Sequence, residues 1–153
     1  MELALTVAVI LALVLWYRNR RTALKVLVID DEYDRQDWFL GTLQRTGLKM
    51  RITQAHNDTE AMIAFRDNKF DLAFFDHDLG QWSDNGSIIA GKVRILHTEY
   101  NCPKAVIVHS MNYQGARNIA SKFNDIPTAV ISFDTLMDST PKNVKETIQA
   151  LLK

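Results

Sequence analysis

The residues of this chain that are most able to do chemistry directly follow three short apolar segments, each with the composition of a buried strand. The segments are 25–29, 70–75 and 104–108, and the residues that follow them are Asp30, Asp31, Asp76, His77, Asp78, His109 and Ser110. In an open α/β sheet, ligands bind at the carboxyl ends of the parallel strands. The sequence therefore predicts that these side chains converge at one edge of a sheet.

The carboxylates in this group favour a divalent cation. Four ionised carboxylates at adjacent strand ends would repel one another unless they were protonated or bound to a metal. Mg²⁺ prefers oxygen ligands and keeps several of its waters, so it is the expected ion. The predicted metal ligands are Asp30, Asp31, Asp76 and Asp78. The alternative for Asp30 or Asp31 is that it only caps the following helix.

The two imidazoles suit acid–base cleavage of a phosphodiester. One neutral histidine can take a proton from water while a protonated one donates to the leaving oxygen. The predicted catalytic residues are His77, His109 and Asp76. A single histidine at a strand end is more often a hydrogen-bonded structural residue. Side chains alternate between the two faces of a strand, so His77 points away from Asp76 and Asp78 unless the backbone turns there. The acid–base role of His77 depends on that turn.

A phosphate site is indicated where the third apolar segment gives way to a helix. A helix that begins near Gly115 offers free backbone N–H groups and a partial positive charge to an anion. The predicted substrate-binding residues are Ser110, Asn112, Gly115 and Arg117. Ser110 has two other readings, as a nucleophile or as a turn residue, and Arg117 could simply lie solvated on the helix.

Strand and helix patterns alternate five times along the chain. The expected strands are 25–29, 49–54, 70–75, 104–108 and 128–133, and the expected helices are 34–46, 58–66, 87–97, 115–123 and one that starts at the cap-like pair Thr140-Pro141. Such alternation predicts an α/β fold with a doubly wound parallel sheet. Five units favour the flavodoxin-like strand order 2-1-3-4-5, which brings strands one, three and four together.

Length and charge limit the classes of function. The 153 residues suffice for one domain with a proper core. Basic and acidic residues number 18 each, so the formal net charge is zero and long duplex nucleic acid is not an expected partner. Cys102 is the one cysteine, which excludes an internal disulfide.

The N-terminal segment differs in composition from the rest. Residues 3–17 are apolar apart from Thr6, and the basic run 18–21 follows them. This order predicts a membrane anchor at 1–21 and a cytoplasmic α/β domain at 22–153, in a single-pass protein. The apolar run lies at the short end of the spanning range, and a core or amphipathic helix is the alternative.

The same residues carry a resemblance to the receiver superfamily of response regulators: an acidic pair after strand one, an aspartate after strand three and a hydroxyl after strand four. A phosphoacceptor receiver ends strand five with a lysine, whereas this chain has the run 132–134, Ser-Phe-Asp. The chain more closely resembles the cyclic-phosphate-processing receiver-like family. That family's runs Asp-His-Asp-Leu-Gly and His-Ser-x-Asn are present at 76–80 and 109–112. Its Asp-Asp-x-Arg run is not, since position 33 is Tyr33 and the nearest arginine is Arg35.

The resemblance spans the chain from residue 25 to the C-terminus. It implies a receiver-like domain that processes cyclic phosphate ends of nucleotides or RNA, for example in RNA repair. Two other functions stay open. One is a non-catalytic signalling module that docks a protein or binds a nucleotide, and the other is a conventional phosphoacceptor at Asp76.

Overall fold

Five strands form one parallel sheet in the order β2-β1-β3-β4-β5, as the sequence predicts for a flavodoxin-like fold. The computed structural model describes residues 6–7, 10–11, 13–14, 23–96 and 98–153. The strands are β1 (Leu24–Ile29), β2 (Met50–Ala55), β3 (Leu72–Phe75), β4 (Ala105–Val108) and β5 (Thr128–Val130). The helices are α2 (Tyr33–Arg45), α3 (Asp58–Asp67), α4 (Gly86–Ile95), α5 (Tyr113–Lys122), α6 (Phe133–Met137) and α7 (Pro141–Leu151).

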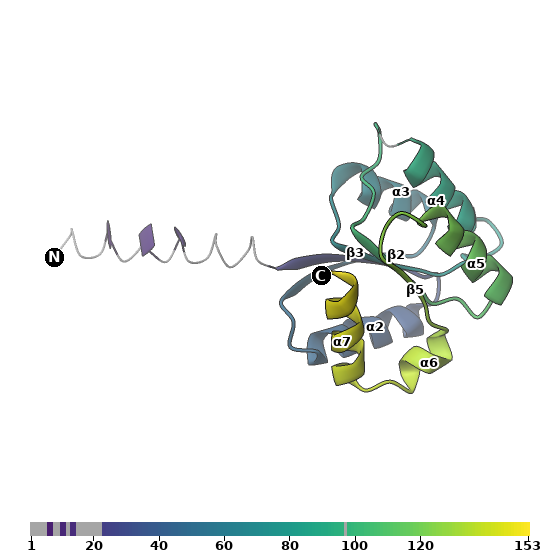
Figure 1. The fold of residues 1–153 in the computed structure, drawn as a ribbon. Helices are drawn as coiled ribbons and strands as arrows, with labels where there is room; N and C mark the ends of the chain where they lie inside the picture. Colours follow the sequence, from purple (N-terminus) through teal and green to yellow (C-terminus); the bar gives the residue numbers. More distant parts are fainter. Residues whose placement is uncertain (1–5, 8–9, 12, 15–22, 97) are drawn as a thin grey trace.

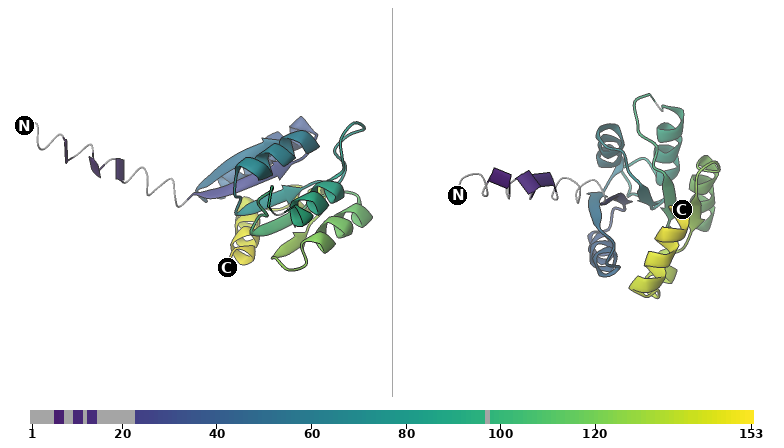
Figure 2. Two further views of the ribbon diagram at one scale, coloured as in Figure 1. Left: turned by 90° about the horizontal axis from the view of Figure 1, so that it is seen from above. Right: turned by 60° about the vertical axis from the view of Figure 1, so that its left-hand side comes forward.

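Helices cover both faces of the sheet, and each face has its own hydrophobic core (Figures 1 and 2). The central strands β3 and β4 are buried along their whole length, because their apolar runs supply side chains to both faces. Phe75 enters the core beside α3, α4 and α5, whereas its neighbour Phe74 enters the core beside α2 and α7. Each such buried phenylalanine contributes about 1.5–3 kcal/mol.

Side-chain caps set the points where the helices begin. Asn57, Asn85, Asn112, Ser132 and Thr140 each accept a hydrogen bond from the backbone N–H three residues further on. Such a cap satisfies one of the free N–H groups of the first turn and is typically worth about 1 kcal/mol. The caps therefore fix the lengths of the strand–helix loops that carry the polar residues.

The last strand is shorter than the sequence predicts. A strand was expected over 128–133, but β5 ends at Val130 and a short helix, α6, begins at Phe133. The cause is Ser132, whose hydroxyl accepts the Thr135 N–H and starts the helix. Phe133 then packs into the core beside α2 instead of continuing the strand.

The membrane prediction is corrected. Most of the segment 1–17 on which it rested lies outside the described residues, as do both residues of the predicted boundary, 21 and 22. Across the part of the chain that the structure describes, no helix combines the length and the apolar character that a bilayer crossing requires. This finding overturns the single-pass membrane localisation, and the division at residue 21 stays a prediction.

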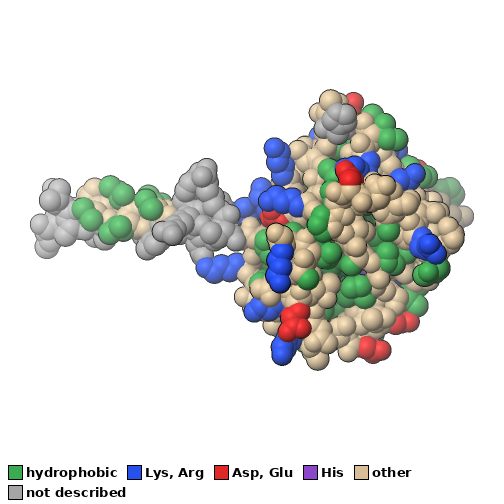
Figure 3. All heavy atoms as spheres, in the orientation of Figure 1, with side chains coloured by type: hydrophobic (Ala, Val, Ile, Leu, Met, Phe, Trp, Pro, Cys, Tyr) green, Lys and Arg blue, Asp and Glu red, His purple; other side chains and the backbone are tan. Residues whose placement is uncertain are grey.

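The described surface carries both signs of charge. On the face drawn in Figure 3, Lys and Arg side chains occur together with Asp and Glu side chains around the α/β domain. This distribution accords with the formal net charge of zero. The absence of a long duplex nucleic acid among its partners stays a prediction from that charge.

Candidate functional site at the carboxyl edge of the sheet

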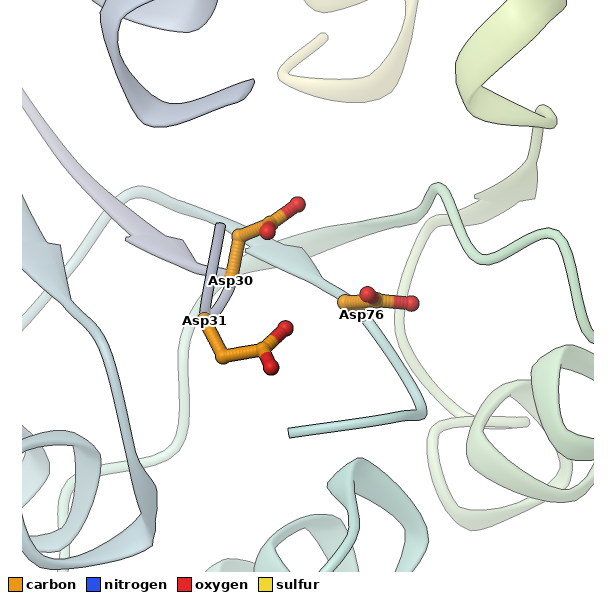
Figure 4. A group of neighbouring side chains, drawn as sticks. All are labelled: Asp30, Asp31 and Asp76. Atoms are coloured by element: carbon orange, nitrogen blue, oxygen red, sulfur yellow. The ribbon is translucent and has the colours of Figure 1, made fainter. Parts of the chain in front are cut away.

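Three aspartates gather where β1 and β3 end (Figure 4). The register pairs Ile29 with Phe75, so Asp30 and Asp76 leave adjacent strands at the same level. One carboxylate oxygen from each of Asp30, Asp31 and Asp76 lies within 4.8 Å of the others. Asp30 and Asp76 are buried, whereas Asp31 is partly exposed. The structure thus brings together three of the four predicted metal ligands.

Asp78, the fourth predicted metal ligand, lies apart from this acidic cluster. Its side chain is 64% exposed and its Oδ1 is 2.7 Å from Nδ1 of His77. The chain turns after β3, so that Asp78 accepts a hydrogen bond from an imidazole instead of facing the other carboxylates. This contact is made with the His77 ring and not with the acidic cluster.

Arg35 lies within the acidic cluster and was not among the predicted site residues. Its Nε is 3.0 Å from Asp30 Oδ1 and its Nη2 is 3.0 Å from Asp76 Oδ2. The same Nη2 is 3.6 Å from Asp31 and 3.3 Å from Glu32. Its guanidinium also lies 5.6 Å from the centre of the Phe133 ring.

The start of α2 explains how Arg35 reaches the cluster. The helix begins at Tyr33, so Arg35 is in its first turn, and Asp31, four residues earlier, lies just before the helix and within 3.6 Å of the guanidinium. The sequence did contain a signal, because Arg35 is the arginine nearest to the Asp-Asp pair. Tyr33 instead points outward, with its ring stacked on His56 at a centroid distance of 4.4 Å.

Burial perturbs the proton affinity of Asp30. Desolvation raises the pKa of the Asp30 carboxyl to about 7, against the opposing effects of the Glu32 N–H bond and the Arg35 charge. The Oδ2 atom of Asp30 is buried and has no hydrogen-bond partner among the described residues. A carboxyl in this state is close to half ionised at neutral pH.

The donor set fits a hard divalent cation. Three carboxylates supply oxygen ligands of the kind that Mg²⁺ prefers, and Asp30 has a buried oxygen that still lacks a partner. Arg35 already offsets part of the negative charge. A cation at the cluster would therefore share these carboxylates with the guanidinium or displace it.

His109 is sealed in the core beside α2. Its ring is fully buried, and its nearest ring neighbour is Phe39, at a centroid distance of 4.7 Å. Phe74 and Phe133 both lie 6.4 Å away. Neither ring nitrogen has a hydrogen-bond partner within the described structure, although Nδ1 is 3.7 Å from Asp30 Oδ2. Desolvation lowers the pKa of His109 to about 3, so the ring is neutral.

His77 lies instead beside α5. A Cβ built on Gly115 would come within 2.3 Å of its ring, so the imidazole rests directly on the glycine backbone. Its side chain is 14% exposed and lines a cavity of about 510 Å³ that also touches α4. The Nδ2 atom of Asn112 lies 3.3 Å from Nδ1 of His77.

The structure therefore does not bring the two imidazoles together. The register pairs Phe75 with Val108, so Asp76 is level with His109 and His77 lies one position further along. Successive strand residues face opposite sides of a sheet, which sends His77 toward α5 and His109 toward α2. The alternation of side chains along a strand thus places His77 and His109 on opposite faces of the sheet, although each follows the end of a neighbouring strand.

The predicted substrate-binding residues are only partly gathered. Ser110 is buried and its Oγ accepts the Asn112 N–H at 3.1 Å. Asn112 in turn accepts the Gly115 N–H at 2.9 Å, so a side chain already caps the start of α5. Arg117 lies on the exposed side of α5, where its guanidinium is 5.6 Å from the centre of the Tyr113 ring.

Two comparisons of the sequence with known proteins relate the chain to receiver and sensory transduction proteins. Residues 25–125 match the sequence model of a family described as "Cyclic-phosphate processing Receiver domain". A curated relative, the sensory transduction protein LytT of Bacillus subtilis (strain 168), is 38% identical over 71 residues, which are 46% of this chain. The matched part covers 29% of LytT, so this chain corresponds to less than a third of that protein.

Solved receiver structures share the fold. The response regulator TrrA of Thermotoga maritima, solved in complex with Mg²⁺-BeF, is 25% identical with a TM-score of 0.61, covering 84% of this chain and 99% of TrrA. A CheY-like receiver domain from Methanospirillum hungatei is 18% identical with a TM-score of 0.59, covering 85% of this chain and 94% of that domain. With the family match over well over half of its length, this chain belongs to the cyclic-phosphate processing receiver domain family.

Proposed function

We propose that this domain binds a divalent cation and a cyclic phosphate at the carboxyl edge of its sheet, and that it opens the phosphate ring by hydrolysis. The observation that carries the proposal is the cluster of three carboxylates with Arg35 among them. The family description supplies the substrate class, a cyclic phosphate end of a nucleotide or RNA. Asp30, Asp31 and Asp76 would hold the cation, which when bound offsets negative charge on the phosphate oxygens.

The phosphate would be bound by side chains around the cluster. Arg35 offers a planar set of N–H donors, which suits two oxygens of one phosphate. The Ser110 hydroxyl and the Asn112 amide lie on the β4–α5 loop, next to the start of α5. Arg117 remains the outermost of the proposed substrate contacts, and it would reach only a longer substrate such as an RNA end.

Proton transfer is assigned to His77 alone. Its Nδ1–H donates to Asp78, so Nε2 carries the free lone pair, as in an oriented general base. His77 would take a proton from the attacking water, whose oxygen bonds to phosphorus while one ring P–O bond breaks. The leaving oxygen then takes a proton from solvent. His109 receives no proton in this scheme, because it is sealed among phenylalanine rings.

The test is hydrolysis of 2′,3′-cyclic nucleotides with Mg²⁺ and with EDTA. We expect product only with the cation, and we expect His77→Gln and Asp76→Asn to lower kcat by about 100-fold or more. Lys142→Ala, on the exposed surface of α7, is the matched control and should change nothing. Equal turnover by the wild type and the His77→Gln variant would contradict the assigned role.

A non-catalytic receiver module is the second candidate. The observation in its favour is the buried position of His109, which leaves His77 as the one accessible imidazole of the two in the family motifs. Such a module would bind a nucleotide or a protein without cleaving a bond. Calorimetry that detects nucleotide binding, with no product after prolonged incubation, would favour it over the hydrolase.

A further inference from the structure

We propose that the cavity beside Asp31 binds the base of a nucleotide whose phosphate lies at the acidic cluster. This inference rests on the proposed function and names its substrate class as a nucleotide with an intact base. The cavity has a volume of about 500 Å³ and is lined by residues 57–60 at the start of α3 and 79–83 of the following loop. Small-molecule sites in proteins commonly have volumes of about 300–1,000 Å³.

The cavity adjoins the acidic cluster directly. Gly80 is one of its lining residues, and a Cβ built on Gly80 would lie 3.3 Å from Asp31 Oδ2. Asp31 is also the most exposed of the three clustered aspartates. One ligand can therefore place an anionic group at the cluster and a ring in the cavity.

The loop holds an aromatic ring open to solvent. Trp82 lines the cavity and is 93% exposed, which makes its indole available as a stacking surface. The next residue anchors the loop, because the Ser83 hydroxyl accepts the Asp58 N–H at 2.9 Å and donates to Asp58 Oδ1 at 3.0 Å. Buried Leu79 fixes the other end. Trp82 is thus presented from a braced loop.

A second aromatic surface lies next to the same region. Tyr33 is 71% exposed and stacks on His56, the residue directly before the cavity lining at 57–60. Every base has a π-face, so aromatic side chains bind bases by stacking without regard to sequence.

The polar lining favours a neutral ring over a second phosphate. Asp58 and Glu60 bring carboxylates to the cavity, and these would repel an anion. The same carboxylates can accept hydrogen bonds from the amino groups at the edge of a base. The charges thus direct the phosphate toward Arg35 and the cation, and the base toward Trp82.

The experiment compares a 2′,3′-cyclic nucleotide with ribose 2′,3′-cyclic phosphate, which lacks the base. Both are titrated by calorimetry, with Mg²⁺, into the full chain carrying His77→Gln to suppress turnover. We expect the nucleotide to bind about 10- to 100-fold more tightly, since stacking contributes that much for each base. Trp82→Ala should remove this difference, and Trp82→Phe should retain most of it.

Two controls separate the outcomes. Neither Trp82 variant should change binding of the ribose compound, and Ile95→Ala, at another exposed apolar site, on α4, should change binding of neither ligand. Equal affinities for both ligands would overturn the base site while the proposed function stands. Failure of both ligands to bind would overturn both.

Discussion

At the scale of single residues, Arg35 is the side chain on which the acidic cluster depends. It contacts Asp30 and Asp76 at 3.0 Å each, and both carboxylates are buried. Buried charges persist only when they are paired, because each has lost its hydration. Arg35 therefore makes the cluster compatible with a folded chain before any cation binds.

Removing the positive charge of Arg35 should lower the stability of the fold. We expect Arg35→Gln to lower the free energy of unfolding by about 3 kcal/mol, since it leaves buried carboxylates unpaired. The measurement is urea denaturation at neutral pH in EDTA. Arg66→Gln, which removes an exposed pair with Asp67, is the control and should leave the midpoint unchanged. A stable Arg35→Gln variant would show that the carboxylates are protonated or hydrated instead.

His109 should be replaceable by phenylalanine. Its two nitrogens lack partners in a cavity walled by phenylalanine rings, so His109→Phe removes unsatisfied polar atoms at similar volume. We expect this variant to raise the free energy of unfolding by about 1–3 kcal/mol. His109→Ala should lower it, because it leaves a cavity.

Activity of the His109→Phe variant then tests the role of the residue. The proposed chemistry does not use His109, so cyclic nucleotide hydrolysis should persist at about the wild-type rate. If the variant folds but has lost activity, His109 takes part in catalysis, as the sequence predicted.

At the scale of elements, two helix starts press on the segment that leaves β3. A Cβ built on Gly86 of α4 would lie 2.0 Å from the Asp76 carbonyl oxygen, and Gly115 of α5 meets the His77 ring as described. The Gly86 N–H also donates to the His77 carbonyl at 2.8 Å. These close contacts are possible because glycine has no side chain, and they hold Asp76 and His77 in place.

A methyl group at the start of α5 should therefore act on His77. We expect Gly115→Ala to push the imidazole away from Asp78 and to lower kcat by about 10- to 100-fold. Gly91→Ala on α4 is the matched control, because nothing lies within 4 Å of its built Cβ. That change should stabilise the helix by about 0.5–1 kcal/mol. Unchanged kcat in the Gly115→Ala variant would show that ring position is not critical.

The elements also show why sequence reasoning succeeded or failed. The uninterrupted apolar runs of β3 and β4 predicted central strands and so the sheet order, and Thr140-Pro141 predicted the start of α7. The end of β5 was missed because Ser132 was read as strand, although its hydroxyl caps α6. The position of Arg35 depends on the exact start of α2, which apolar periodicity does not resolve.

The convergence of Asp30, Asp31 and Asp76 was predictable from the sequence, whereas the positions of Asp78 and of the two histidines were not. Asp30, Asp31 and Asp76 converge because parallel strands end at one edge, which needs only the strand order. The faces reached by His77 and His109 depend on a one-residue difference in register and on the turn after β3. The strand period indicated that His77 would face away from Asp76, but the sequence did not resolve the turn that follows β3.

At the scale of the whole molecule, cation binding should be linked to both stability and pH. The raised pKa of Asp30 means that, between about pH 4 and 7, the folded chain binds a proton that the unfolded chain has released. The contribution of Asp30 to stability is therefore lost as the pH rises through this window. Mg²⁺ requires the ionised carboxylate, so its affinity should rise over the same range.

Thermal unfolding with Mg²⁺ or EDTA measures this linkage. At free Mg²⁺ about 100 times its Kd, the domain should gain about 2.7 kcal/mol near pH 7.5 and clearly less near pH 5.5. Asp30→Asn should abolish both the gain and its pH dependence. The same gain at both pH values would mean that Asp30 does not ligate the ion.

The acidic cluster lies at the ends of two strands that are adjacent in the sheet but separated in the chain by α2, β2 and α3. A peptide that carries only one of these strand ends lacks part of the ligand set, and grafting the Asp-Asp pair onto another scaffold would transfer only two of the three carboxylates. Ligand capture can occur only after the central strands have paired. Binding of a cation, measured by an optical signal or by calorimetry, would therefore show that the central strands of the chain have paired.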